Sequence, residues 1–202
     1  MPSVHLPVPA RVATPKDIDA IVDAMTTAFF QDPLWGPAFP DEPRRAMQAA
    51  AMWRLYVTSA QRYPWTLVTP GVEAAAVWIP PNGTELTPHE EAGLEELLTQ
   101  AAGTEAAKAI LAIYAQLEAA HPTEPCFYLT LLGVHGNHRG KGLGMGLLAE
   151  SLIRIDALGA PAYLESSNPA NIARYQRAGF IPRDEITTAT GHVVTTMWRP
   201  AR

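Results

Sequence analysis

The spacing of apolar residues predicts helices in the first half of the chain. One set of apolar residues recurs every three or four positions, which places it on one helical face; it comprises Ile18, Ile21, Val22, Met25 and Phe29. Thr14-Pro15-Lys16-Asp17 precedes this set with an N-cap Thr and a first-turn Asp, so a helix begins there. We expect it to end near Gln31-Asp32-Pro33, and expect further helices over residues 42–61 and 87–119, the latter broken near Gly103.

Shorter runs of β-prone residues lie between and after these helices. Residues 63–69 and 72–79 flank a Pro70-Gly71 turn, which predicts an antiparallel hairpin. Further strands are expected over residues 11–13, 126–134, 161–167, 180–186 and 192–198, with a helix after residue 142 and a short one over 168–178. A strand, a glycine turn, a helix and a strand imply a right-handed βαβ unit with parallel strands. We therefore expect one α/β domain over residues 1–202 with a mixed sheet.

Composition narrows the class of protein. With 48% hydrophobic and 17% charged residues, the 202-residue chain can bury a sizeable core. A net charge of −5 disfavours nucleic acid as a partner. The single Cys126 excludes an internal disulfide and a zinc site of paired cysteines. Neither a membrane-length apolar run nor a signal-peptide pattern is visible, so we expect a cytoplasmic protein without a membrane partner or a metal.

A glycine-rich stretch, VHGNHRGKGLGMGLL over residues 134–148, stands where a helix is expected to begin. Glycine destabilises a helix by about 1 kcal/mol relative to Ala, so its repeated use suggests a ligand close to the backbone. Unpaired N–H groups at a helix N-terminus suit a phosphate or pyrophosphate. A Walker loop fails because Gly142 follows Lys141 where Ser or Thr is needed, and the dinucleotide fingerprint fails at Met145 and Leu147.

The pattern that does fit is [QR]-x-x-G-x-[GA], carried by Arg139, Gly142 and Gly144. It resembles the pyrophosphate loop of the GCN5-related N-acetyltransferase (GNAT) superfamily. LLGV before it is similar to the family's fourth strand, whose bulge splays it from the fifth. LESSNPANIARYQRAGF after it is similar to the fifth strand and next helix, with the Y-x-x-x-G-F ending at Tyr175. The resemblance covers residues 126–181 and implies a GNAT-type mixed, splayed β-sheet flanked by helices.

Segments outside this core, AMTTAFFQDP, AAAVWIPP and TTMWRP, resemble puromycin N-acetyltransferase-like members of the superfamily. One departure is Gly136, where the family frequently has Pro. The resemblance implies transfer of an acetyl group from acetyl-CoA to a primary amine of a small molecule, directly within a ternary complex. Detoxification of an amino-nucleoside is one such activity.

Site residues follow from the resemblance. The coenzyme is expected to contact Leu132, Gly133, Val134, Arg139, Gly140, Lys141, Gly142, Leu143, Gly144, Asn168 and Asn171. The Val134 N–H is the expected oxyanion donor, and Tyr175 the acid that protonates the departing sulfur. The alternatives are a core role for Tyr175 and a purely capping role for Asn168.

The group that removes the proton from the amine is less defined. Glu165 is the first candidate and Asp32 the second, while Glu165 could also only position the substrate and Asp32 could anchor a cationic one. Trp35 and Phe39, with Tyr56, are expected either to form an aromatic acceptor pocket or to belong to the core. His135 is expected to be a loop residue without a chemical role. Cys126 is expected to belong to the core, because it lies about eight residues from the reactive end of its strand.

Two other functions compete with an enzyme. One is a catalytically idle acyl-CoA-binding sensor or regulatory module, and the other is a nucleotide-binding domain of similar pattern. The first helix, residues 31–42 and the helices over 87–119 are expected to wall the acceptor site. A monomer or a homodimer fits the sequence equally well.

Overall fold

The computed structural model describes residues 6–202, so residues 1–5 of the proline-rich N-terminal segment lie outside it. One seven-stranded sheet runs through the molecule in the order β1-β2-β3-β4-β5-β7-β6. Its strands are β1 (Arg11–Val12), β2 (Thr66–Val68), β3 (Ala74–Ile79), β4 (Phe127–Val134), β5 (Ala162–Ser166), β6 (Ile181–Thr187) and β7 (Val193–Arg199). Only β4 and β5 pair in parallel; every other neighbouring pair is antiparallel, which confirms the expected mixed sheet.

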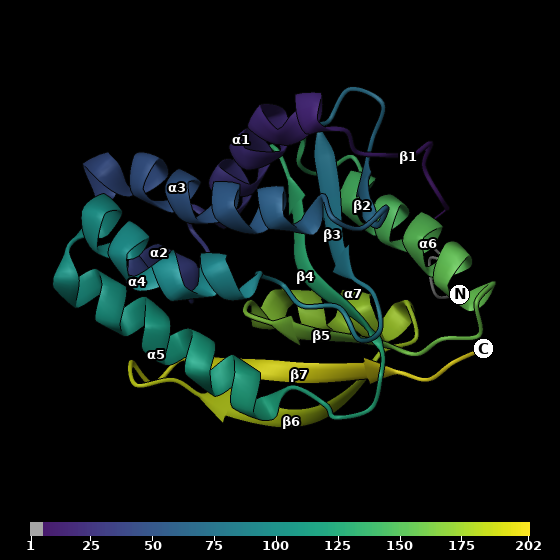
Figure 1. The fold of residues 1–202 in the computed structure, drawn as a ribbon. Coiled ribbons are helices and arrows are strands. Elements are labelled where there is room, and N and C mark those ends of the chain that lie inside the picture. Colours follow the sequence, from purple (N-terminus) through teal and green to yellow (C-terminus); the bar gives the residue numbers. More distant parts are fainter. Residues whose placement is uncertain (1–5) are drawn as a thin grey trace.

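Helices cover both faces of this sheet (Figure 1). They are α1 (Ile18–Phe29), α2 (Trp35–Ala38), α3 (Glu42–Ala60), α4 (Pro88–Ala102), α5 (Thr104–Ala120), α6 (Leu143–Asp156) and α7 (Ile172–Arg177). Single 3₁₀ turns precede α1 (Pro15–Asp17), α6 (Gly136–His138) and α7 (Pro169–Asn171). No helix described over residues 6–202 is long and apolar enough to cross a membrane.

Side chains alternate between two cores on either side of the sheet. In β3, Ala75, Val77 and Ile79 join a core with α1, α3, α4 and α5, called the α1-side core. Ala74, Ala76 and Trp78 face the opposite way and join the α6-side core. All six side chains of this strand are buried, because helices cover the sheet on both faces.

Several local predictions are confirmed by the backbone. Thr14 and Asp17 form a capping box at the start of the first helix, with Pro15 in the first turn. Gly103 separates α4 from α5. The single helix expected over residues 168–178 is instead a 3₁₀ turn followed by α7, and residues 31–42 contain the short α2.

β4 contains a bulge at Thr130, opposite β3. Leu129 pairs with Trp78 and Leu131 pairs with Val77, so Thr130 is an extra residue opposite β3. Residues two apart in a regular strand share a face, yet Leu129 lies in the α6-side core and Leu131 in the α1-side core.

The pairing of β4 with β5 ends at the same place. The parallel register runs only from Phe127 to Leu129 on β4 and from Ala162 to Leu164 on β5. Beyond Leu129 the two strands separate, which confirms the splayed sheet expected from the sequence.

Candidate active site

The gap between β4 and β5 opens into a cavity of about 600 Å³, called the first cavity. Residues 129–134 of β4 and 164–168 at the end of β5 form its two sides. The glycine loop, the start of α6, and Tyr175 of α7 close it on the α6 side. Because the sheet is split here, backbone groups that would otherwise be paired between strands face an open space.

The glycines of the loop fall into two kinds. Gly140 and Gly142 adopt left-handed backbone with φ of 79° and 76°, and a Cβ at either would have nothing within 4 Å. Their outer side is therefore an open cradle that a ligand can approach. Gly144 and Gly146 instead permit packing, since a Cβ would lie 3.0 Å from Val134 Cγ2 at the first and 2.5 Å from Val8 Cγ1 at the second.

The two basic residues of the loop are not equivalent. The Arg139 guanidinium donates to the carbonyl oxygens of Thr27 at 2.7 Å and Ala28 at 3.0 Å. It therefore ties the loop to the end of α1 while lining the cavity. Lys141 does not line the cavity, and its Nζ lies 3.5 Å from His138 Nδ1.

The N–H of Val134 points toward the gap. The next residue, His135, donates its N–H to Glu73 O at 2.8 Å on the β3 side. Successive N–H groups of a strand point in opposite directions, so that of Val134 faces the β5 side, where the partner strand has departed. This is the position of a donor able to stabilise negative charge on a carbonyl oxygen.

Tyr175 lies on the α6 side of the split. Its ring packs against Phe180 at 6.1 Å between centroids. Burial, and then the nearby charge of Asp32, raise the pKa of its hydroxyl to about 12. The phenol is therefore protonated at neutral pH and can donate a hydrogen bond into the first cavity.

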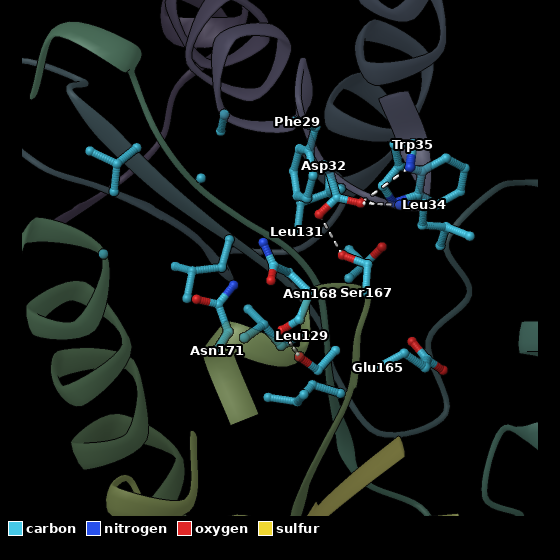
Figure 2. Close-up of a pocket in the computed structure, with 18 of the residues that line it drawn as sticks. Phe29, Asp32, Leu34, Trp35, Leu129, Leu131, Glu165, Ser167, Asn168 and Asn171 are labelled. Carbon is cyan, nitrogen blue, oxygen red and sulfur yellow. Dashed lines mark hydrogen bonds between the residues drawn. The ribbon is translucent and has the colours of Figure 1, made fainter. Parts of the chain in front are cut away.

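Asn168 and Asn171 line the same cavity next to each other (Figure 2). Asn168 Oδ1 accepts from the Ala170 N–H at 3.0 Å, which supports the capping role. Asn171 Oδ1 accepts from Arg174 Nη1 at 2.9 Å. Both carbonyl oxygens are thus occupied, which leaves the amide NH₂ groups as their donors to a ligand.

Asp32 holds the far wall of the first cavity together and is only 8% exposed. Its Oδ1 accepts from the N–H groups of Leu34 at 2.9 Å and Trp35 at 3.1 Å. Its Oδ2 accepts from Ser167 Oγ at 2.8 Å, as Figure 2 shows. This carboxylate connects the end of α1 to the end of β5.

Asp32→Ala is expected to destabilise the fold, because it leaves two buried N–H groups without a partner at about 1–3 kcal/mol for each unsatisfied group. Asp32→Asn retains an acceptor for those groups and should cost less. Urea unfolding of both variants measures the difference. Equal stability of Asp32→Ala and the wild type would contradict this role.

The aromatic residues expected at the acceptor site divide between cavity and core. Trp35 and Tyr56 line the first cavity, whereas Phe39 is fully buried and lines neither cavity. Tyr56 stacks on Tyr114 at 5.1 Å, and Trp35 lies 5.5 Å from the same ring. Tyr114, from α5, is an aromatic wall that the sequence did not single out.

Glu165 lies on β5 at the split in the sheet. On β5, Ala162 and Leu164 belong to the α6-side core, so Glu165 points to the opposite side, toward α5. Its Oε1 is buried and has no hydrogen-bond partner among residues 6–202. Burial is the main cause that raises the pKa of Glu165 to about 8, against the opposing effect of the Tyr128 and Tyr163 hydroxyls.

A second carboxyl group, the half-buried Glu85, lines the same two cavities and was missed by the sequence reasoning. It accepts a hydrogen bond from Thr130 Oγ1, so the bulge residue holds it. Burial raises its pKa to about 7. Glu85 follows a Pro-Pro-Asn-Gly loop that carries no motif, and the lone polar Thr130 in an apolar strand was the available signal.

A second cavity of about 660 Å³ lies on the α5 side of the split. The β3–α4 loop, α5 and residues 121–126 line it. Both cavities share six lining residues, namely Tyr56, Glu85, Tyr114, Leu117, Tyr128 and Glu165. The two cavities therefore adjoin at the split, and this junction, called the passage, has Glu165 and Glu85 on its wall, whereas Tyr175 lines the first cavity alone.

Most of the expected site residues lie together around the first cavity. Those that line it are Asp32, Trp35, Leu132, Gly133, Val134, Arg139, Gly140, Gly142, Leu143, Gly144, Glu165, Asn168, Asn171 and Tyr175. Lys141 and Phe39 do not. His135 is held by Asp23, with Nε2 3.2 Å from the carboxylate, and burial raises the pKa of Cys126 to about 11. Residues 6–202 contain no group of three or more His, Cys, Asp or Glu side chains placed to hold a metal ion.

Comparison with known proteins points to one fold. The model of the acetyltransferase (GNAT) family matches residues 92–180. A protein from Corynebacterium glutamicum described as histone acetyltransferase HPA2 and related acetyltransferase is 24% identical, with a TM-score of 0.70 over 98% of this chain and 97% of its own.

Two amine acetyltransferases are also similar in structure. An agmatine N-acetyltransferase is 20% identical, with a TM-score of 0.67 over 95% of this chain and 98% of its own. A polyamine N-acetyltransferase of Drosophila melanogaster, which forms N-acetylagmatine, is 19% identical, with a TM-score of 0.62 over 95% and 99%. With its split seven-stranded sheet and the family match across β4, α6 and β5, this chain has the fold of the GNAT acetyltransferases.

Proposed function

We propose that the protein is an acetyl-CoA-dependent N-acetyltransferase that acylates a primary amine of a small molecule by direct transfer. The observation that carries this proposal is the passage through the split sheet. Here a cavity with an open glycine cradle adjoins a second cavity, and the carboxyl group of Glu165, one oxygen of which is buried without a hydrogen-bond partner among residues 6–202, lies between them. A transferase of this kind needs two substrates to meet from different sides at one point.

The residues around the first cavity fit a coenzyme with a pyrophosphate and an acyl thioester. The N–H groups of the loop from Arg139 to Gly144 lie at the N-terminus of α6, where the helix dipole favours an anion. The exposed edge of β4 offers unpaired backbone groups to an amide-containing arm. The Val134 N–H would stabilise the negative charge that develops on the acyl oxygen.

Glu165 has the properties of a base for the acceptor amine. An alkylammonium with a pKa of about 10 must lose a proton before it attacks. A carboxyl group with a pKa near 8 is a better proton acceptor than an ordinary one, and Glu165 lines both cavities where they adjoin. Asp32 is the weaker candidate, because both of its oxygens already accept hydrogen bonds.

Tyr175 is proposed as the donor to the departing sulfur. A thiol has an ordinary pKa of about 8.5, below the value of about 12 for Tyr175. The phenol therefore stabilises the thiolate by donating a hydrogen bond, and the proton released by the amine can complete the thiol. The sulfur is thus protonated by the proton that the amine released, and Tyr175 does not become a charged tyrosinate.

The acceptor is proposed to be a small amine. Two structural neighbours are named for the acetylation of agmatine and of polyamines. The resemblance to puromycin N-acetyltransferase-like proteins extends the proposal to amino-nucleoside detoxification, so puromycin belongs in the same amine panel. The cytoplasmic location and the monomeric or dimeric state stay predictions.

The test combines coenzyme binding with turnover. Thermal stability is measured with acetyl-CoA, CoA, ATP and NAD, and thiol release is then followed with an amine panel. We expect stabilisation by acetyl-CoA and CoA alone; a ligand at one hundred times its Kd adds about 2.7 kcal/mol. Binding without turnover of any amine would favour the idle acyl-CoA-binding module, and absence of binding would overturn the proposal.

Tyr175→Phe is expected to lower kcat by about ten- to a hundredfold, because the departing sulfur loses its hydrogen-bond donor. The KM for acetyl-CoA should change little, since the ring and its packing remain. Steady-state kinetics separate the two parameters. An unchanged kcat would show that Tyr175 is only part of the core.

A further inference from the structure

This inference rests on the proposed function and concerns the charge of the second cavity. Five glutamate residues line that cavity, namely Glu85, Glu91, Glu118, Glu124 and Glu165. Among the described residues, no Lys or Arg lines it, and its one basic side chain is His121. Burial lowers the pKa of His121, so this ring is mainly neutral at pH 7.

The five carboxyl groups are arranged in two tiers. Glu85 and Glu165 lie at the inner end, where both cavities meet. Glu91 and Glu118 are exposed at the outer end, on α4 and α5. Glu124 is also exposed, but it lies 3.8 Å from Arg183 and is partly neutralised by that residue.

Two observations describe the environment of the inner tier. Glu165 lines both cavities, and its Oε1 is buried without a hydrogen-bond partner among residues 6–202. After burial, the charge of Glu118 also raises the pKa values of both Glu85 and Glu165, so the outer tier disfavours the charged form of the inner tier. A cation placed in this space would relieve that repulsion.

We infer that the preferred acceptor is an extended dication, in which one amine reaches the passage while a second cationic group lies between Glu91 and Glu118. A diamine or an aminoguanidine has this chemistry. The reacting amine loses its proton at the inner tier, and the second group keeps its charge at the outer tier. The apolar connection between them would run along the aromatic wall of Tyr56, Tyr114 and Tyr128.

The test compares acceptors of one length and different charge. Putrescine carries a second ammonium, butylamine carries none, and 4-aminobutyrate carries a carboxylate instead. We expect kcat/KM to be at least tenfold higher for putrescine than for butylamine, and lowest for 4-aminobutyrate, at low ionic strength. Added salt should reduce the preference for putrescine, because the outer tier is exposed.

Glu118→Gln removes one charge of the outer tier without removing a described ion pair. We expect it to lower the ratio of kcat/KM for putrescine over butylamine about three- to tenfold. Glu95→Gln makes the same change on an exposed face of α4, outside both cavities, and should leave this ratio unchanged.

The outcomes separate this inference from the proposed function. Turnover of butylamine or puromycin as fast as putrescine, or a ratio unaffected by Glu118→Gln, would overturn the dication inference and leave the acetyltransferase in place. Acetyl-CoA binding without turnover of any amine would overturn both the dication inference and the proposed acetyltransferase activity.

Discussion

Glu165→Gln is expected to lower kcat/KM for amine acetylation by a factor of about 10²–10⁴, the usual contribution of a general base. The amide has nearly the same size and fills the same position on β5, but it cannot take a proton from the acceptor. Thiol-release kinetics with a reactive amine measure the loss. An activity within a factor of two of the wild type would assign the proton to another group.

The pH dependence should carry the same signature. The carboxylate form is the active one, and the pKa of Glu165 in the free protein is about 8. For the wild type, kcat/KM should therefore rise with pH up to about 8, apart from the titration of the amine itself. The variant should lack this limb. If both proteins show the same limb, its origin lies elsewhere.

The same substitution should stabilise the fold at alkaline pH. The folded-state pKa of about 8 lies above the ordinary value of 4.5, so the folded protein binds more protons between these values. Its stability must then fall as pH rises through that window. Glu165→Gln carries no such penalty, so its Tm should exceed that of the wild type at pH 8 by several degrees, with little difference near pH 4.5.

A gain in stability combined with a loss of activity is specific to a buried functional charge. A residue needed only for packing would lose both when replaced. Equal Tm values at pH 8 would contradict the burial of the Glu165 charge, while leaving the kinetic result to be judged separately.

Gly142→Val is expected to weaken acetyl-CoA binding at least tenfold. Gly142 has a φ of 76° as the N-cap of α6, and a β-branched residue is strained in this region. The Cβ would also project into the open cradle, where a phosphate must approach the backbone closely. Isothermal titration with acetyl-CoA and with CoA measures the change.

Gly191→Val is the matched control for that strain. Gly191 lies in the turn between β6 and β7 with a φ of 80°, and a Cβ there also has nothing within 4 Å. Both variants should lose stability by about 1–2 kcal/mol from left-handed strain. Only Gly142→Val should lose coenzyme affinity; equal affinities in the two variants would place the pyrophosphate elsewhere.

The fold was largely predictable because short local sequence patterns determine most of its helices and turns. The α1 face, the Thr14 capping box and the Gly103 break are each encoded within a few residues. The short α2 was not predictable, because Gly36 and Pro37 disfavour a helix. Its turn is held by the Asp32 carboxylate, which accepts from the N–H groups of Leu34 and Trp35.

The same distinction applies to the site: residues in local motifs could be predicted, and residues whose role depends on distant contacts could not. The glycine loop and Tyr175 belong to a contiguous pattern, so they could be proposed from the sequence. Glu85 could not, because its significance depends on Thr130, 45 residues away, and on the bulge that turns Thr130 toward it. The exclusion of Phe39 from both cavities likewise depends on tertiary packing, since an aromatic residue in a loop suits a pocket and a core equally well.

The bulge at Thr130 also bears on how the opening in the sheet could be gained or lost. Leu129 and Leu131 face opposite cores only because one residue is inserted between them. Without Thr130 they would be neighbours, and ordinary alternation would send each side chain to the core it already occupies. At the level of the gene, a regular β4 and the bulged β4 differ by a single codon. Inserting or deleting that codon requires no further substitution in either hydrophobic core.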